Sequence, residues 1–305
     1  MPPALKVAVV GAGYFGRFHA EKLAAIPGVT LVAVADADPA RATAVGGPLG
    51  AEALASHVML DGTVDAVTIA AATSAHFEIA RFFLERGVHC FVEKPIATTA
   101  AEAAALVELA ARRQLVLQVG HIQRVLFAAL DARALVDRPH FAEAVRVAPY
   151  KVRATDVGVV LDLMIHDIDL VLALFGAPVT DVTARGARVM SATEDWCNAR
   201  LTFAGGAVAS LTASRVSDAV QRSIRVFGAA GSAAIDLQAR RAVAVRKSAD
   251  GTLATEERIA PAGDDLAAEL AGFAASIRDR VPPLASGADG LAALDVATRI
   301  IAQLS

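Results

Sequence analysis

The sequence predicts an α/β half built on a doubly wound parallel sheet, followed by an α+β half built on a mainly antiparallel sheet. Apolar, strand-like runs alternate with helical segments up to about residue 120, which is typical of a parallel sheet with crossover helices. Beyond Pro178, short strand-like runs are separated by tight-turn residues. A chain of 305 residues is long enough for two domains, each with its own core. We therefore expect domains over 1–120 and 121–305, with some later helices packing back on the first domain.

In the first half the expected strands carry continuous Val, Ile, Ala and Leu runs, as strands buried on both faces do. They cover 7–10, 31–35, 64–70, 88–92 and 115–119. Helices are expected between them, including one from Ala75 to Glu85 capped by Ser74. Another ends at Arg113 and is capped by Thr98 or Thr99.

In the second half we expect a helix over 122–136, a strand over 141–150 and a strongly apolar helix over 160–175. Strands should then follow one another through hairpins, with turns at Gly205-Gly206 and between Gly228 and Gly231. These strands are expected over 179–189, 196–203, 207–215, 221–227, 233–237 and 242–246. Two helices, over 264–280 and 288–304, close the chain on either side of Pro282-Pro283.

The first strand runs into Gly11-Ala12-Gly13-Tyr14-Phe15-Gly16, a glycine pattern that can hold a dinucleotide. Gly11 permits the tight turn, Gly13 lets the pyrophosphate approach the backbone, and Gly16 lets the helix pack on the sheet. The helix N-terminus, with Tyr14 and Phe15, offers unpaired N–H groups to the phosphates. The alternative is an ordinary turn that binds nothing. A strand before the glycines, a helix after them and an acidic residue at the expected distance further on together favour a Rossmann domain.

That acid is Asp36, which lies 20 residues after Gly16 at the end of the second strand. Its carboxylate can accept hydrogen bonds from both ribose hydroxyls of the adenosine half and would repel a 2′-phosphate. The sequence therefore favours NAD over NADP as cofactor.

Several polar residues fall just after strand ends, where ligands of such sheets bind. They are Thr73, His76, Glu93 and Lys94, and we expect them to face the same crevice as the glycine loop. Glu93-Lys94-Pro95 could be a surface turn, as most turns with a lysine are. Beside a nicotinamide, however, the Lys94 ammonium would stabilise an alkoxide as it forms and hold a sugar hydroxyl, with Pro95 fixing the backbone.

Asp162, His166 and Asp169 are spaced i, i+4, i+7 in the apolar helix, so on an α-helix they share one face. Mutual pairing and solvation is the simplest interpretation. A metal site is a second interpretation, but it is weak because no other His or Cys pair occurs at the spacing of metal ligands. We favour acid–base catalysis, in which a carboxylate fixes the tautomer of a histidine that exchanges a proton with a substrate hydroxyl.

Composition excludes several classes of function. The net charge is −3 and no long basic run exists, so nucleic acid is not an expected partner. No uninterrupted apolar run approaches the roughly 20 residues of a membrane span, and a signal peptide is not expected. Cys90 and Cys197 are isolated thiols, best interpreted as buried small residues in a reducing cytoplasm.

With these motifs the chain resembles the glucose–fructose oxidoreductase / inositol dehydrogenase / rhizopine catabolism (Gfo/Idh/MocA) family over essentially its whole length. The resemblance implies an N-terminal Rossmann domain and a C-terminal domain with an open antiparallel sheet, often used for homodimer or homotetramer contacts. It also implies NAD(P)-dependent oxidation or reduction at a carbinol of a sugar or cyclitol. Lys94 corresponds to the family's E-K-P lysine, Asp162 and His166 to its D-x-x-x-H pair, and Gly11, Gly13, Gly16 and Asp36 to its dinucleotide-binding residues.

The pattern over 158–169, together with Gly120-His121-Ile122-Gln123-Arg124, is most similar to members that oxidise nucleotide-linked amino sugars, such as UDP-N-acetylglucosamine at carbon 3. The resemblance thus implies that Lys94, Arg124, Asp162 and His166 bind the substrate. The chain departs from such members at Val125-Leu126-Phe127 and at Ala72-Thr73-Ser74. These differences affect positions expected to contact the substrate or the cofactor, and they leave the residues expected to transfer the proton and the hydride unchanged. Oxidation of a free sugar or inositol, a non-catalytic NAD-binding sensor or repressor, and reduction of a non-sugar carbonyl or linear tetrapyrrole remain alternatives.

Overall fold

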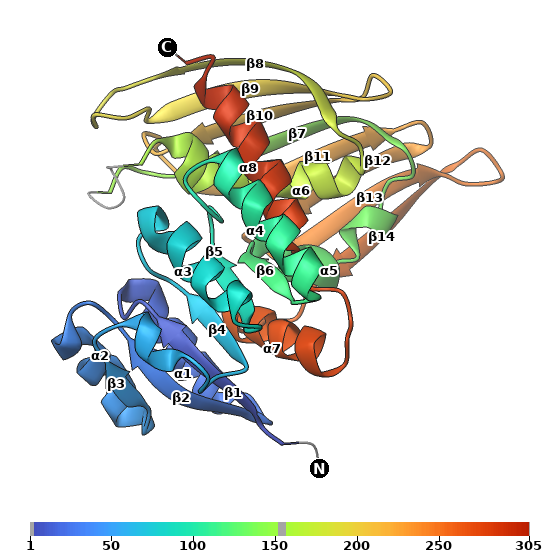
Figure 1. Cartoon of the computed structure of the whole chain (residues 1–305). Coiled ribbons are helices and arrows are strands. Elements are labelled where there is room, and N and C mark those ends of the chain that lie inside the picture. Colours follow the sequence, from blue (N-terminus) through green and yellow to red (C-terminus); the bar gives the residue numbers. More distant parts are fainter. Residues whose placement is uncertain (1–2, 152–156, 305) are drawn as a thin grey trace. The chain divides into compact units, whose positions relative to one another are not determined.

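The computed structural model describes residues 3–151 and 157–304 of the chain (Figure 1). It divides into two compact units. The first contains residues 1–122 and 264–291, and the second contains residues 123–263 and 292–305. The segment 264–291 therefore belongs with the N-terminal sheet, although it follows the second sheet in the sequence.

The first unit is built on a six-stranded parallel sheet with strand order β3-β2-β1-β4-β5-β6. This is the doubly wound order, in which the reversal between β1 and β4 opens a crevice at the carboxyl ends of the strands. The predicted parallel Rossmann sheet is confirmed. Its strands are β1 (Leu5–Val10), β2 (Val29–Ala35), β3 (Glu52–Leu54), β4 (Ala66–Ile69), β5 (His89–Glu93) and β6 (Leu117–Gly120).

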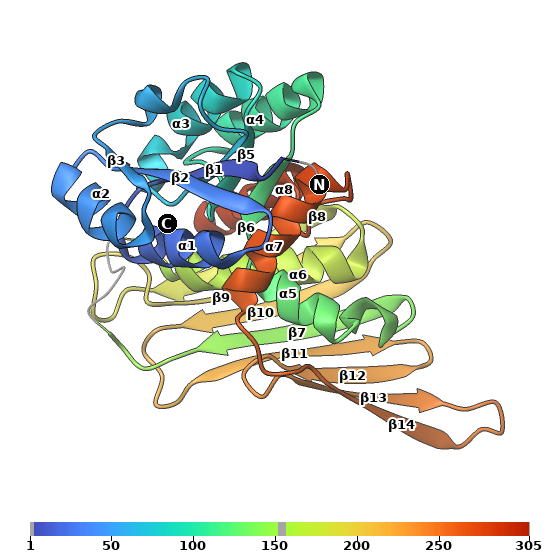
Figure 2. The ribbon, with the colours of Figure 1, turned by 90° about the horizontal axis from the view of Figure 1, so that it is seen from below.

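Helices cover both faces of this sheet. Figure 2 shows α3 (Thr73–Glu85) and α4 (Ala100–Arg113) on one face, and α1 (Tyr14–Ala25) and α7 (Asp265–Arg278) on the other. The core between the sheet and these two helices, α1 and α7, is apolar. Leu23 of α1, Phe91 of β5 and Phe273 of α7 are all fully buried in it. The remaining elements of this unit are α2 (Pro39–Gly46) and the 3₁₀ turns η1 (Gly47–Leu49) and η2 (His57–Leu60).

The helix caps confirm one prediction and correct another. Thr99 caps α4 through a full capping box: its hydroxyl accepts from the Glu102 N–H, and the Glu102 carboxylate accepts from the Thr99 N–H. The predicted cap at Ser74 is wrong, because α3 already begins at Thr73, with Ala72 at the cap position and no side-chain cap.

The second unit contains an eight-stranded sheet in the order β14-β13-β12-β11-β7-β10-β9-β8. Only the β7–β10 pair is parallel, so the sheet is mainly antiparallel as predicted. The strands are β7 (Pro139–Val147), β8 (Val179–Ala187), β9 (Trp196–Phe203), β10 (Val208–Ser214), β11 (Gln221–Gly228), β12 (Gly231–Asp236), β13 (Arg241–Lys247) and β14 (Leu253–Ile259). Both glycine turns lie where the sequence predicts them, between β9 and β10 and between β11 and β12.

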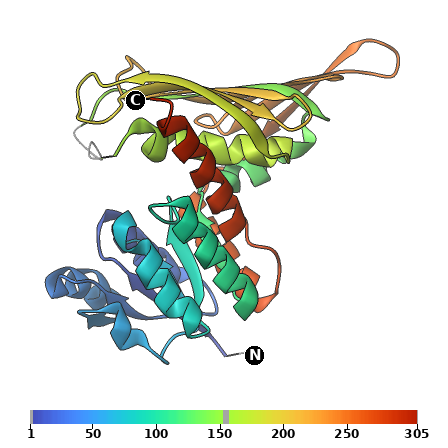
Figure 3. The same ribbon diagram turned by 45° about the horizontal axis from the view of Figure 1, so that its top comes forward.

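Helices of this unit line one face of the sheet, and Figure 3 shows α6 (Ile165–Phe175) lying along it. The expected helix over 122–136 is shorter, because α5 (Gln123–Ala129) ends early and is followed by a 3₁₀ turn, η3 (Ala132–Ala134). The expected α-helix over 160–175 begins instead with a π-helical turn, η4 (Val160–Met164). The last helix, α8 (Gly287–Ile301), packs its later half into the core of this unit through Ala293, Val296 and Ile300. Among the described residues, no helix is both long and apolar enough to span a membrane.

Candidate active site

The glycine loop has the geometry that its three glycines require. Gly11 has φ +99°, and a Cβ there would lie 2.6 Å from the backbone of Ala70 and Ala71 at the end of β4. A Cβ on Gly16 would overlap the Gly11 carbonyl oxygen, so only glycine lets α1 approach the strand. Gly13, the N-cap residue of α1, has open space on its Cα. A phosphate could therefore approach the first-turn N–H groups of the helix.

Asp36 lies at the carboxyl end of β2 and faces the loop. Its Oδ2 accepts a hydrogen bond of 2.6 Å from the Ala12 N–H, and its Oδ1 accepts one of 2.8 Å from the Asp38 N–H. Both contacts fix the carboxylate beside the glycine loop. This is the place where the sequence predicts contact with the adenosine ribose.

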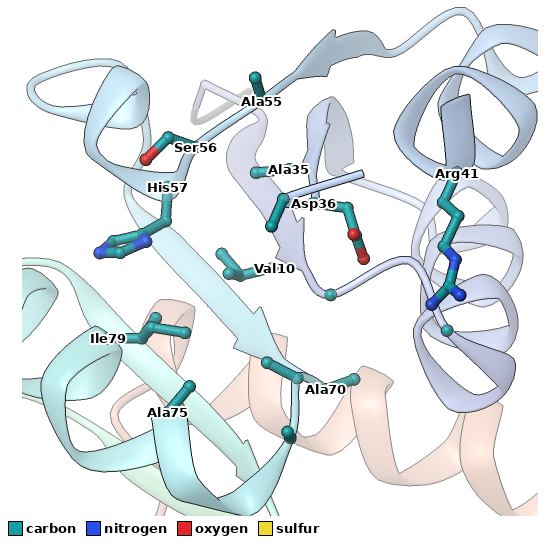
Figure 4. A pocket seen from close by; sticks show the side chains of 15 residues that line it. Val10, Ala35, Asp36, Arg41, Ala55, Ser56, His57, Ala70, Ala75 and Ile79 are labelled. Carbon is teal, nitrogen blue, oxygen red and sulfur yellow. The ribbon is translucent and has the colours of Figure 1, made fainter. Parts of the chain in front are cut away.

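A cavity of about 390 Å³ opens beside Asp36 and the glycine loop. Its wall includes Gly11, Gly13 and the β4–α3 connection at Ala70, Ala71 and Ala72. Figure 4 shows the side chains of Asp36 and Arg41 on one side of this cavity, with His57 and Ile79 on the other. Glycines, a helix N-terminus and the Asp36 carboxylate surround this cavity, an arrangement that fits the adenosine and pyrophosphate parts of NAD.

Two titratable wall residues, Arg41 and His57, are not among the candidates that the sequence predicts. Arg41 lies on α2, with its Nε 3.3 Å from Asp38 Oδ2, and His57 lies on η2, where burial lowers the pKa of its imidazole. A local signal for α2 does exist. Asp38 caps the helix by accepting from the Ala40 N–H, and Pro39 stands in its first turn.

The other predicted dinucleotide-binding residues lie at the starts of α1 and α3. Tyr14 and Phe15 open α1 and are 61% and 51% exposed, with their rings in edge-to-face contact at 5.4 Å. Thr73 is the first residue of α3 and is half-buried.

Glu93 ends β5, and its carboxylate is held inside the first unit. Oε1 lies 3.0 Å from Nε2 of His19, a fully buried residue of α1, and Oε2 accepts from the Lys94 N–H at 3.2 Å. Burial by itself would raise the pKa of the Glu93 carboxyl. The His19 hydrogen bond and the nearby charges outweigh burial, and the pKa lies below its usual value. Glu93 is therefore a carboxylate, and His19 must donate to it through Nε2–H.

The E-K-P turn continues through Lys94, which is half-buried, and the Lys94–Pro95 peptide bond is cis. His76 of α3 is 1% exposed. Its Nδ1 lies 2.9 Å from the Pro95 carbonyl oxygen, and its Nε2 lies 3.1 Å from the Ala71 carbonyl oxygen. The structure thus places His76 against the turn that carries Lys94. A direct contact between His76 and NAD stays a prediction.

In the second unit, Asp162 lies in the π-helical turn and His166 in the first turn of α6, and both are half-buried. The α-helical spacing assumed for Asp162 therefore does not apply across this turn. π-turns frequently mark functional sites, since the extra residue re-aims the side chains around it.

The third member of the predicted polar face, Asp169, is held by Arg124. The guanidinium of Arg124, the second residue of α5, makes two parallel contacts of 2.6 and 2.7 Å with the Asp169 carboxylate. Asp169 is 1% exposed. Substrate binding by Arg124 stays a prediction. Among the described residues, no three His, Cys, Asp or Glu side chains gather as metal ligands.

Two family models match the chain. An oxidoreductase family model with an NAD-binding Rossmann fold matches residues 5–121, and the Gfo/Idh/MocA C-terminal domain model matches residues 130–234. Together they cover the glycine loop, the E-K-P turn and the Asp162/His166 segment.

Curated relatives and solved structures agree with these models. The chain is 38% identical over 303 residues to a UDP-N-acetylglucosamine 3-dehydrogenase of Acidithiobacillus ferrooxidans, which covers 97% of this chain and 96% of the relative. A solved structure of such an enzyme from the same organism has a TM-score of 0.92 at 37% identity, covering 99% of this chain and 98% of that one. A scyllo-inositol 2-dehydrogenase (NAD⁺) of Bacillus subtilis is 30% identical over 71% of this chain and 69% of its own length. On this evidence the chain belongs to the Gfo/Idh/MocA family of NAD-binding oxidoreductases.

Proposed function

We propose that this oxidoreductase uses NAD to oxidise the hydroxyl at carbon 3 of UDP-N-acetylglucosamine, or of a closely related nucleotide-linked amino sugar, to a ketone. The observation that carries the proposal is 38% identity, extending over 97% of the chain, to an enzyme named for that reaction. The chain also has the E-K-P lysine and the D-x-x-x-H pair, to which we assign the chemistry of the carbinol oxidation.

Lys94 supplies a positive charge in this scheme. Its ammonium hydrogen-bonds the hydroxyl that reacts and stabilises the negative charge that develops on its oxygen. NAD, when bound, accepts the hydride from the carbinol carbon. Asp36 holds the cofactor by its adenosine ribose, and the glycine loop holds it by the pyrophosphate.

His166 is the proposed proton acceptor for the same hydroxyl. An imidazole has the right basicity for this exchange near neutral pH, provided that one tautomer is fixed. Asp162, one turn earlier in the sequence, is the carboxylate proposed to fix it. Arg124 is proposed as a substrate contact from α5.

We further propose that the enzyme is a cytoplasmic homodimer or homotetramer. The two thiols, Cys90 and Cys197, are both buried and unpaired, as expected in a reducing compartment. Burial raises the pKa of both thiols, that of Cys197 to about 12, so neither is a reactive thiolate.

The test is reduction of NAD, followed optically, with UDP-N-acetylglucosamine, free N-acetylglucosamine, UDP-glucose and scyllo-inositol. We expect turnover with UDP-N-acetylglucosamine and at least about tenfold lower kcat/KM with each of the others, since each lacks a recognised group. Preferential turnover of scyllo-inositol would replace the proposal by the activity named for the second relative. Binding of NAD without turnover of any of the four would favour the sensor.

A further inference from the structure

The residues on either side of Lys94 are each held by a buried histidine. Glu93, before it, contacts His19 of α1, and Pro95, after it, contacts His76 of α3. The two imidazoles are 0% and 1% exposed. Two histidines from different helices thus meet one three-residue turn.

The contact with Glu93 leaves its carboxylate little freedom. A Cβ on Gly120, the neighbouring residue of β6, would lie only 2.8–2.9 Å from all three carboxyl atoms. The carboxylate therefore packs against the bare Cα of that glycine while it accepts from His19 and from the Lys94 N–H. His19 is itself fixed by an edge-to-face contact with Phe91, at 5.4 Å between ring centroids.

The contact with Pro95 joins the turn to the wall of the NAD cavity. Burial lowers the pKa of the His76 imidazole, which favours the neutral ring with a single N–H to donate. The shorter contact, from Nδ1 to the Pro95 oxygen, is the one to which we assign this hydrogen. The opposite edge of the ring rests on Ala71, which lines the cavity.

We propose that His19 and His76 are positioning residues that set the place of Lys94 relative to the elements that bind the dinucleotide. The inference deepens the proposed function and rests on it for the role of Lys94. His19 belongs to the helix that starts at the glycine loop, and His76 rests on the cavity wall. A lysine on a flexible turn would not stay in this position relative to the cofactor. A displacement of about 1 Å at a reacting group can lower the rate by about 100-fold.

Substitution of His19 and His76 by amide side chains of different length tests the contacts with Glu93 and Pro95. A glutamine amide reaches about as far as Nε2 of histidine, and an asparagine amide about as far as Nδ1. We expect His19→Leu, His19→Asn and His76→Leu to lower kcat by about 10- to 100-fold, with the NAD dissociation constant of the two His19 variants within about threefold of the parent. His19→Gln and His76→Asn should recover kcat to within about fivefold, because each restores the required donor.

A matched control is His89→Leu at the opposite end of β5, where Nδ1 accepts from the Val116 N–H. It removes a partly buried histidine from the same strand, so it should lower stability and leave kcat within about twofold. Since leucine at a buried site weakens folding, the decisive comparison is His19→Gln against His19→Asn, with melting temperatures recorded for both. Equal kcat in these two variants would overturn the role of His19.

The second readout does not depend on turnover. The chain has five lysines, so after reductive ¹³C-methylation the Lys94 signal can be assigned by comparison with Lys94→Arg. We expect that signal to shift in His19→Asn and His76→Leu, to return in His19→Gln and His76→Asn, and to stay fixed in His89→Leu. An unchanged Lys94 signal in every variant would overturn the inference. Shifted signals in a protein that oxidises none of the sugars would instead leave the positioning intact and remove the proposed function.

Discussion

Lys94 is the residue on which the proposed chemistry depends most. Replacing it by alanine removes the charge that stabilises the developing alkoxide and leaves the dinucleotide cavity untouched. We expect kcat to fall by about 10²- to 10⁴-fold, with the NAD dissociation constant within about twofold. Steady-state kinetics and calorimetric titration with NAD measure the two effects. Lys247→Ala, an exposed site at the end of β13, is the control, and full turnover by Lys94→Ala would remove this lysine from the mechanism.

We expect Asp36 to control the choice between NAD and NADP. Its carboxylate already accepts from the Ala12 N–H, and Asp36→Asn keeps an acceptor there while removing the charge that repels a 2′-phosphate. The guanidinium of Arg41 lines the same cavity and would favour that phosphate. We expect the ratio of kcat/KM for NADP to that for NAD to rise by about tenfold or more. Asp61→Asn, outside this cavity, should leave the ratio unchanged, and an equal ratio in Asp36→Asn would mean that another group selects the cofactor.

Elements of the second unit are tied together by a buried ion pair. Asp167 of α6 is 2% exposed, and its carboxylate receives two hydrogen bonds, of 2.9 and 2.7 Å, from the guanidinium of Arg146 on β7. Asp167→Ala leaves a buried cation unpaired and should lower the free energy of unfolding by about 3–5 kcal/mol. Urea denaturation measures this. An Arg146→Met, Asp167→Leu double variant should recover most of the loss, and a double variant no better than the single one would contradict that reason.

The capping box of α4 offers a smaller test in the first unit. Thr99→Ala removes the acceptor for the Glu102 N–H and should lower the free energy of unfolding by about 1 kcal/mol. Glu108→Ala on the exposed face of the same helix breaks only its pair with Arg112 and should cost less than about 0.5 kcal/mol. Equal losses of unfolding free energy in the two variants would mean that the capping box stabilises the protein no more than a surface ion pair does.

Elements set by local signals could be predicted from the sequence. The glycine loop and its strands follow from residue type and spacing within about 30 residues, and so does the place of Asp36. The edge strand β14 was missed because its Thr-Glu-Glu-Arg stretch is exposed on an outer strand and shows no apolar alternation. The π-turn around Asp162 and the pairing of His19 with Glu93 could not be predicted either. The His19–Glu93 contact joins residues that lie 74 positions apart in the chain.

At the scale of the whole molecule, one buried and two partly buried histidines make the fold sensitive to acid. Burial lowers the pKa of His57, His76 and His89 in the folded state. As the pH falls through about 6.5, the unfolded chain takes up protons that the folded chain does not. Stability should therefore decrease between pH 7 and pH 5, by at most about 1.4 kcal/mol per pH unit from His76. Urea denaturation at several pH values measures it, and constant stability across this range would contradict the lowered pKa of these rings.

The central claim for the molecule is oxidation at one carbon of a nucleotide-linked amino sugar. It is tested most directly with UDP-N-acetylglucosamine that carries deuterium on carbon 3 of the sugar. We expect the deuterium to appear in the reduced NAD, detected by mass spectrometry, and to be absent when the label is placed on carbon 4. Reduced NAD without deuterium from carbon 3, or no reduction of NAD at all, would contradict the claim.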